Sequence, residues 1–260
     1  MKQTLRQSSS LFDNTGAMSD SFNPEFKRLG IYFEKLVLHA LQQNNQYDLL
    51  QSNYQVRGNG HTLGEYDAIL LERLSNDVIH CEIAVKFYLQ INSGSELADW
   101  VGPGLHDRLD LKYERLISHQ LMLGEKAQDN GLNDLDVMPT EHKSLLTRGR
   151  LYYAFENFIT QQFVYPKEVY KGHLKGFWIA KDAFESFKRS NAEITWYDLP
   201  KPYWLAPFTA EDIELLRPFD TEKLVGAKQV VGIKDKQELM RGFVVTQDWI
   251  SASARANEIT

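Results

Sequence analysis

Two neighbouring stretches decide the fold: GEYDAILL at residues 64–71 and VIHCEIAVKF at residues 78–87. Both are rich in aliphatic and β-branched residues, which favour strands. Between them, the Ser-Asn-Asp run at residues 75–77 contains turn formers. The sequence therefore predicts a β-hairpin at the centre of the protein.

The two faces of the second strand differ in chemistry, because side chains alternate sides along a strand. We expect the apolar face to pack against helices, so the carboxylate and the ammonium on the opposite face have no packing reason to be there. Asp67 lies near the start of the neighbouring strand, where it can lie beside Glu82. The apolar face carries Ile83, Val85 and Phe87, and the opposite face carries Glu82, Ala84 and Lys86.

This pattern points to a metal site. Mg²⁺ is usually held by one or two carboxylates together with waters and substrate phosphate oxygens, and Asp67 and Glu82 supply such carboxylates. The backbone carbonyl of Ile83 is a further candidate ligand. Lys86 would then contact phosphate or water. The alternative is a pair of exposed strands in which Glu82 and Lys86 form an ordinary ion pair.

The arrangement resembles the PD-(D/E)XK phosphodiesterase superfamily, in which an Asp on one strand precedes a Glu-x-Lys on the next. The segment 64–67 matches the Gly-Glu-x-Asp form seen in resolvase-like branches, with Glu65 in its second position. The resemblance implies that a Glu on an upstream helix, here Glu34, leans towards the metal; the alternative is a solvated helix Glu. Where the superfamily has its lysine, this chain has Ala84, and Lys86 lies about 6.6 Å further along the strand.

The span from Arg28 to Leu123 is also similar to a bacterial family of unknown function that is assigned to the same superfamily. In that family Glu-x-Ala-Val-Lys is the usual form, so Ala84 would be a family trait. The similarity continues more loosely through the segments 176–178 and 203–207. It implies a fold and a metal site, and it brings no established substrate.

Composition describes an ordinary globular chain of 260 residues, of which 43% are hydrophobic and 25% charged. The formal net charge of −6 argues against a protein that coats nucleic acid by bulk charge. The single cysteine, Cys81, excludes an intrachain disulfide and suits a reducing cytoplasm. We find no apolar run long enough to span a membrane and no signal peptide, and so expect a cytoplasmic protein without membrane contact.

The predicted fold is α/β: a restriction-endonuclease-like mixed central β-sheet flanked by α-helices. Helices are expected at 24–45, starting at Asn23 and Pro24, and at 105–123. We expect a single nuclease-like domain. Its parts are a flexible extension at 1–22, the domain at 23–250 with its core at 24–180 and an elaboration at 181–250, and a frayed tail at 251–260.

The second predicted helix carries Arg108 and Lys112 four residues apart, on one side, where they can contact a phosphate backbone. Asp107, Asp110 and Glu114 lie among these cations, so a self-paired solvated face is the simpler interpretation. Further along, Trp196 and Trp204 are candidates for base stacking, but tryptophan among leucine and proline more often belongs to a core.

Other chemistries find little support. The histidines lack zinc-ligand spacing, and there is no phosphate-binding loop and no Gly-x-Ser-x-Gly elbow. We therefore expect hydrolysis of nucleic-acid phosphodiesters, with DNA the expected substrate and Mg²⁺ or Mn²⁺ as cofactor. Asp67, Glu82, Lys86 and Glu34 are the expected catalytic residues. The alternatives are a non-catalytic nucleic-acid or protein binding module, and a hydrolase of a smaller phosphodiester.

Overall fold

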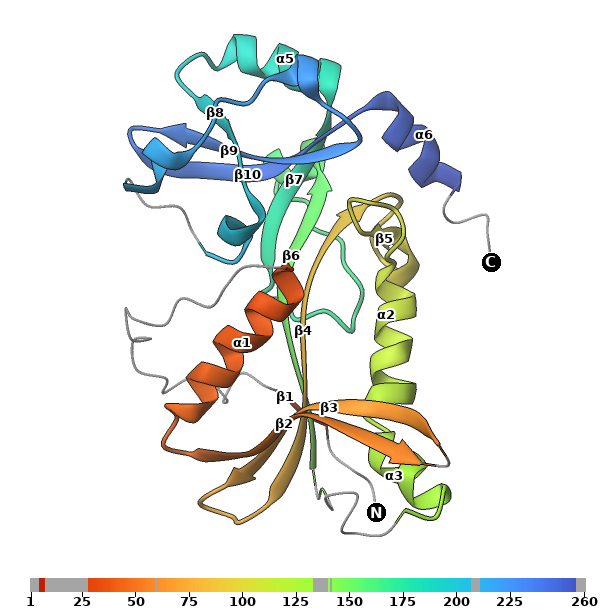
Figure 1. Ribbon diagram of the computed structural model, residues 1–260. Coiled ribbons are helices and arrows are strands. Elements are labelled where there is room, and N and C mark those ends of the chain that lie inside the picture. The colour runs from red at the N-terminus through yellow and green to blue at the C-terminus, as the bar shows by residue number, and fades with distance from the viewer. Residues whose placement is uncertain are drawn as a thin grey trace. The chain divides into compact units, whose positions relative to one another are not determined.

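The computed structural model describes residues 5–7, 28–58, 60–132, 140, 142–206 and 211–255. The chain is a mixed α/β protein built on a large mixed β-sheet flanked by helices (Figure 1), which confirms the predicted class. It divides into two compact units. Unit 1 comprises Met1–Val85 and Tyr113–Arg148, and unit 2 comprises Lys86–Lys112 and Gly149–Thr260.

Unit 1 is built around the expected hairpin. Strands β2 and β3 pair antiparallel, β3 pairs antiparallel with β4, and β1 pairs parallel with β6. Strands β4 and β6 are long enough to contribute residues to both units. The elements are β1 (Leu5–Gln7), α1 (Leu29–Gln42), β2 (Tyr47–Gly58), β3 (His61–Glu72), β4 (Val78–Gln90) and β6 (His142–Ala154).

The hairpin turn forms where the turn residues predict it. The Glu72 amide donates to the Asp77 carbonyl at 2.9 Å, and Asn76 takes a left-handed backbone with φ of 63°. Of the helix expected at 24–45, Leu29–Gln42 is α1. The expected start at Asn23 and Pro24, and most of the expected extension, lie outside the described residues.

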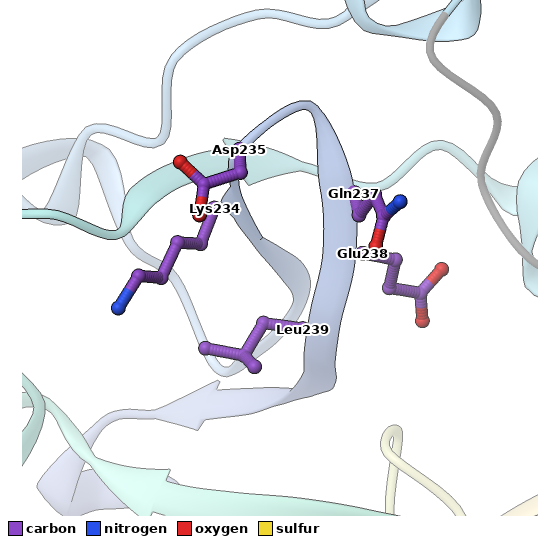
Figure 2. Close-up of a pocket in the computed structure, with 5 residues that line it drawn as sticks. All are labelled: Lys234, Asp235, Gln237, Glu238 and Leu239. Atoms are coloured by element: carbon purple, nitrogen blue, oxygen red, sulfur yellow. The ribbon is translucent and has the colours of Figure 1, made fainter.

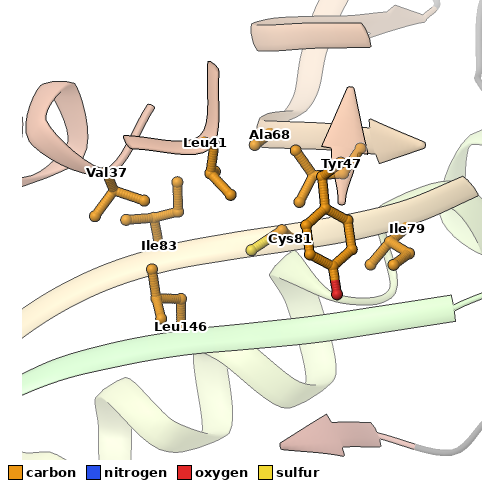
Figure 3. Close-up of a cluster of buried hydrophobic side chains, with 9 residues drawn as sticks. Val37, Leu41, Tyr47, Ala68, Ile79, Cys81, Ile83 and Leu146 are labelled. Carbon is orange, nitrogen blue, oxygen red and sulfur yellow. The ribbon is translucent and has the colours of Figure 1, made fainter. Parts of the chain in front are cut away.

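The apolar face of β4 packs as the alternation predicts. Val37 and Leu41 of α1 lie against Cys81 and Ile83 of β4 (Figure 3). Leu146 of β6 completes this cluster, and the largest exposed fraction among these five side chains is 9%. Cys81 is fully buried, and burial raises the pKa of its thiol to about 12, so it is an inert core residue.

The second predicted helix, at 105–123, is wrong in its bounds and its regularity. Leu105 has a left-handed backbone, with φ of 63°, in a turn closed by its amide on the Gly102 carbonyl, so no helix begins there. Instead α2 (Leu109–Arg115) leads into a π-helical turn, Leu116–Gln120, and after a break α3 (Leu123–Asp129) follows. The apolar spacing predicts helical structure here, but a single π-helical turn alters that spacing too little to be recognised in so short a segment.

Unit 2 continues the mixed sheet. Strands β6, β7 and β10 run parallel in that order, and β9 and β8 follow antiparallel. The elements are β5 (Trp100–Val101), α4 (Phe155–Ile159), β7 (Leu174–Ala180), α5 (Lys181–Ser190), β8 (Thr195–Asp198), β9 (Ala227–Lys234), β10 (Gln237–Val245) and α6 (Gln247–Arg255).

Aromatic side chains form much of the core of unit 2. Trp196 is 3% exposed and packs edge-on against Phe184, with ring centroids 5.0 Å apart. Trp204 packs edge-on against Phe87 and Phe243. Both tryptophans therefore act as packing residues, the simpler of the two interpretations of the sequence.

Helix α6 ends at Arg255, so it includes residues 251–255 of the expected tail; the rest of that tail lies outside the described residues. Its Trp249 is 5% exposed, and the indole N–H donates to the Pro103 carbonyl at 2.8 Å. This buried anchor explains why the helix persists near the chain end, and the sequence alone gives no partner for it.

Candidate functional site

Asp67 and Glu82 meet where the β3–β4 ladder ends. The last paired residues are Ala68 and Cys81, so the same register places Asp67 opposite Glu82. Asp67 Oδ2 accepts a hydrogen bond from the backbone N–H of Ile83 at 2.8 Å. The carboxyl group thus takes the place of a strand partner. The Asp67 side chain also shares a hydrogen bond with Glu82, so the two carboxyl groups are in direct contact.

Glu82 is fully buried and held at both oxygens. Oε1 lies 2.7 Å from His80 Nε2, and Oε2 accepts a hydrogen bond from Gln120 Nε2 at 2.6 Å. Burial lowers the pKa of His80 to about 4, so the imidazole is neutral at pH 7 and donates to the carboxylate through Nε2. Two donors stabilise a charge that burial would otherwise penalise.

Asp67 is the perturbed member of the pair. Burial, followed by the charge of Glu82, raises its pKa from an ordinary 3.8 to about 7, although the Ile83 amide opposes this shift. A carboxyl group that titrates near neutrality beside a second carboxylate is a typical feature of functional sites. Two desolvated carboxyl groups in contact need either a shared proton or a cation.

Glu34, on α1, belongs to the same neighbourhood. Its pKa is raised, first by burial and next by the negative charge of Asp67. Its carboxylate accepts a hydrogen bond from the side chain of Asn53, which lies in β2 between the paired positions 52 and 54 and hence opposite Asp67. Glu65 also acts on Glu34 electrostatically, and its Oε2 accepts from Gln55 at 3.2 Å. The structure therefore brings Glu34, Asp67 and Glu82 into one neighbourhood of unit 1.

The predicted cations belong to unit 2, and Lys86 and Arg108 have acidic partners there. Lys86, 37% exposed in its side chain, forms an ion pair with Asp107, which also accepts a hydrogen bond from Tyr88 at 3.3 Å. Arg108 binds Asp110 through both Nε and a terminal nitrogen, at 3.1 and 2.6 Å.

Lys112 is partly exposed on α2. The Arg108–Asp110 pair is the self-paired arrangement that the sequence offered as the simpler interpretation.

Three residues of the site were missed by the sequence analysis. His80 lies two residues before Glu82, so strand alternation on the same face was the signal that could have found it. Asn53 interrupts β2 with a left-handed backbone at φ 52°, a conformation in which asparagine is enriched. Gln120 gave no signal, because it reaches Glu82 through a π-helical turn.

The described residues contain no group of three or more His, Cys, Asp or Glu side chains that is arranged to hold a metal ion. The Asp67–Glu82 pair supplies two such side chains and falls short of a group of three. A recess in unit 2, on the β9–β10 hairpin, is lined by Lys234, Asp235, Gln237, Glu238 and Leu239 (Figure 2). Both oxygens of Glu238 bind Arg241 at 2.5 Å, so this recess does not offer a second acidic site.

Comparison with known proteins gives a family. The model of a family described as Domain of unknown function (DUF1853) matches residues 5–248, which is most of the chain and includes segments of both units. No curated protein and no solved structure matches the chain. No helix in the part of the chain that the structure describes is long and apolar enough to cross a membrane.

Proposed function

The chain belongs to the DUF1853 family, and we propose that it is a metal-dependent phosphodiesterase of PD-(D/E)XK type that hydrolyses nucleic acid, with DNA the expected substrate. We place it in the cytoplasm, because its one cysteine is a buried free thiol that needs no oxidising compartment. The proposal includes a restriction-endonuclease-like identity for the core of the fold.

The observation that carries the proposal is the contact between the carboxyl groups of Asp67 and Glu82. The two residues come from adjacent strands, in the order that the nuclease-like pattern requires, and Glu34 approaches from the preceding helix. Structural carboxylates are normally exposed or paired with cations. A buried pair in contact, with one pKa raised to about 7, is instead typical of a site with a function.

The residues present fit a divalent cation of the Mg²⁺ or Mn²⁺ type. Such ions prefer oxygen ligands, and two carboxylates suffice when water and phosphate oxygens complete the shell. Burial and then the negative charge of Glu82 raise the pKa of Asp67, and a bound cation would oppose both effects. When bound, the ion polarises the phosphoryl group and lowers the pKa of a ligand water. In this proposal Asp67 and Glu82 hold the ion, and Glu34 adds negative potential beside Asp67.

Two observations favour a second candidate, a non-catalytic binding module on a nuclease-like fold. Lys86, the expected catalytic ammonium, is paired with Asp107, and both oxygens of Glu82 already accept hydrogen bonds. In a binding module the Asp67–Glu82 pair shares a proton, and no phosphodiester is cleaved.

A cleavage assay separates these candidates. Single-stranded, duplex and branched DNA and RNA are incubated with Mg²⁺ or Mn²⁺ and the wild-type protein, Asp67→Asn or Lys86→Met. We expect at least one substrate to be cleaved by wild type, and cleavage to fall at least about a hundredfold in Asp67→Asn, because the variant removes one of the two carboxylates that would hold the ion.

The matched controls are Asp129→Asn, at the exposed end of α3, and Lys171→Met, at an exposed lysine of unit 2; both are expected to keep wild-type activity. Activity lost in Lys86→Met assigns the lysine to the reaction, whereas activity kept leaves it an ion-pair residue. If none of the four substrates is cleaved in the presence of metal, the enzymatic function is excluded and the binding module is the remaining candidate.

A further inference from the structure

One helical turn of unit 1 is wound differently from its neighbours. Between α2 and α3, the N–H of Leu121 bonds to the carbonyl of Leu116 at 2.9 Å, which is the five-residue spacing of a π-helix. π-helical turns are rare inside helices and occur frequently at functional sites. The last residue of this turn is Gln120, and its side chain is the one that reaches Glu82.

The contact made by Gln120 is specific in geometry. Its Nε2 donates to Glu82 Oε2 at 2.6 Å, while His80 takes the other oxygen at 2.7 Å. Glu82 has no exposed surface, so water does not replace a lost donor there readily. The two bonds together fix the plane of the carboxylate opposite Asp67.

The winding matters because it sets the direction of the side chain. Successive residues of an α-helix are rotated by about 100°, since there are 3.6 residues per turn. A π-helical turn holds more residues, so every residue after it is displaced around the axis. Gln120 is the last residue of this turn, before the break that precedes α3, and its amide faces Glu82 of β4.

We propose that Gln120 is a positioning residue of the Asp67–Glu82 centre: the π-helical turn aims its amide at Glu82 and holds that carboxyl group oriented for a divalent cation. This inference rests on the proposed function. It assigns to Gln120 no contact with the reacting atoms. Groups that orient a metal-binding carboxylate typically contribute about 10- to 100-fold to metal affinity.

The test is Mn²⁺ affinity, measured by calorimetry on the full chain. Gln120→Met keeps the length of the side chain and removes its donor, and we expect the dissociation constant for Mn²⁺ to rise about tenfold or more. The matched control is Gln128→Met, at an exposed position on α3, for which we expect no change. Circular dichroism of each metal-free variant verifies that the chain is folded.

Two outcomes of this titration are distinguishable. If wild type binds Mn²⁺ and Gln120→Met binds it equally well, the role of Gln120 is overturned while the proposed function survives. If wild type does not bind Mn²⁺, the proposed function fails and the inference falls with it.

A second measurement needs no variant. Hydrogen exchange of the wild-type backbone amides at 116–121 should slow when Mn²⁺ binds, because coupling between the ion and the turn acts in both directions. Unchanged exchange in the presence of bound Mn²⁺ would also overturn the role of Gln120, even if Gln120→Met does not fold.

Discussion

At the scale of single residues, the main feature of the site is how negative charge is divided between Asp67 and Glu82. Glu82 is buried with two hydrogen-bond donors, and its charge then acts on Asp67, which has one donor in the Ile83 amide. Asp67 is therefore the member of the pair that takes up a proton near neutral pH, because its pKa lies near 7. This division of roles resembles other carboxylate pairs, in which one member is ionised and the other exchanges a proton.

The stability of the metal-free protein should depend on this titration. The pKa of Asp67 is higher in the folded state than its ordinary 3.8, so the folded state binds the proton more tightly. The stabilisation of the folded state that comes from protonating Asp67 is fully present below about pH 4 and is lost as pH rises to about 7. As pH rises from about 4 to about 7, we expect the free energy of unfolding of Asp67→Asn to increase relative to that of wild type by about 1 to 4 kcal/mol. A tenfold difference in proton affinity is worth about 1.4 kcal/mol.

Chemical denaturation at a series of pH values with chelator measures this gain. His80 acts in the opposite direction, because its lowered pKa makes neutral His80 favour the fold as pH rises from about 4 to 6.5, but it is present in both proteins. Asp129→Asn is the matched control and should follow wild type. Parallel curves for wild type and Asp67→Asn would show that Asp67 has no raised pKa.

At the scale of elements, strands β4 and β6 come close together at one glycine. Gly149 has φ of 138°, and a Cβ at this position would overlap the backbone carbonyl of Lys86. Both conditions require glycine, because other residues rarely adopt this φ and no side chain can move to relieve a clash with backbone. The close approach lies beside Lys86, a residue that the sequence analysis selected for other reasons.

Gly149→Ala should therefore destabilise the protein by about 3 kcal/mol or more, measured as the free energy of unfolding. The matched substitution is Gly30→Ala, in α1, where a Cβ meets nothing within 4 Å. This control should be neutral or stabilising by up to about 1 kcal/mol, because alanine favours a helix over glycine. Equal effects of the two substitutions would contradict the close approach of β4 and β6.

The elements also show what the sequence can predict. The β3–β4 hairpin follows from strand alternation and turn residues, which are local signals. The prediction of one helix at 105–123 was wrong because Leu105 adopts a left-handed turn and because residues 116–120 wind as a π-helix. Neither feature can be recognised from the apolar spacing of so short a segment. Helix α6 was missed because its stability depends on Trp249 reaching Pro103, a contact 146 residues away in sequence.

At the scale of the whole molecule, the two compact units were not predicted. Strands β4 and β6 pass from one unit to the other without a linker, so no run of glycine, proline or serine marks the boundary. The Asp67–Glu82 proximity could be predicted, since it needs only a hairpin register. The roles of Gln120 and Asn53 could not, because they depend on which segments pack beside the hairpin.

The most direct test of the account is a calorimetric titration of the intact wild-type protein with Mn²⁺ at pH 8 and pH 6. Asp67 titrates near 7, so a proton competes with the cation at the lower pH. We expect Mn²⁺ to bind at pH 8, to bind about tenfold more weakly at pH 6, and to bind Asp67→Asn at least about tenfold more weakly than wild type at pH 8. Absence of binding at pH 8, or equal affinity in wild type and Asp67→Asn, would contradict the claim that Asp67 and Glu82 form a divalent-cation centre.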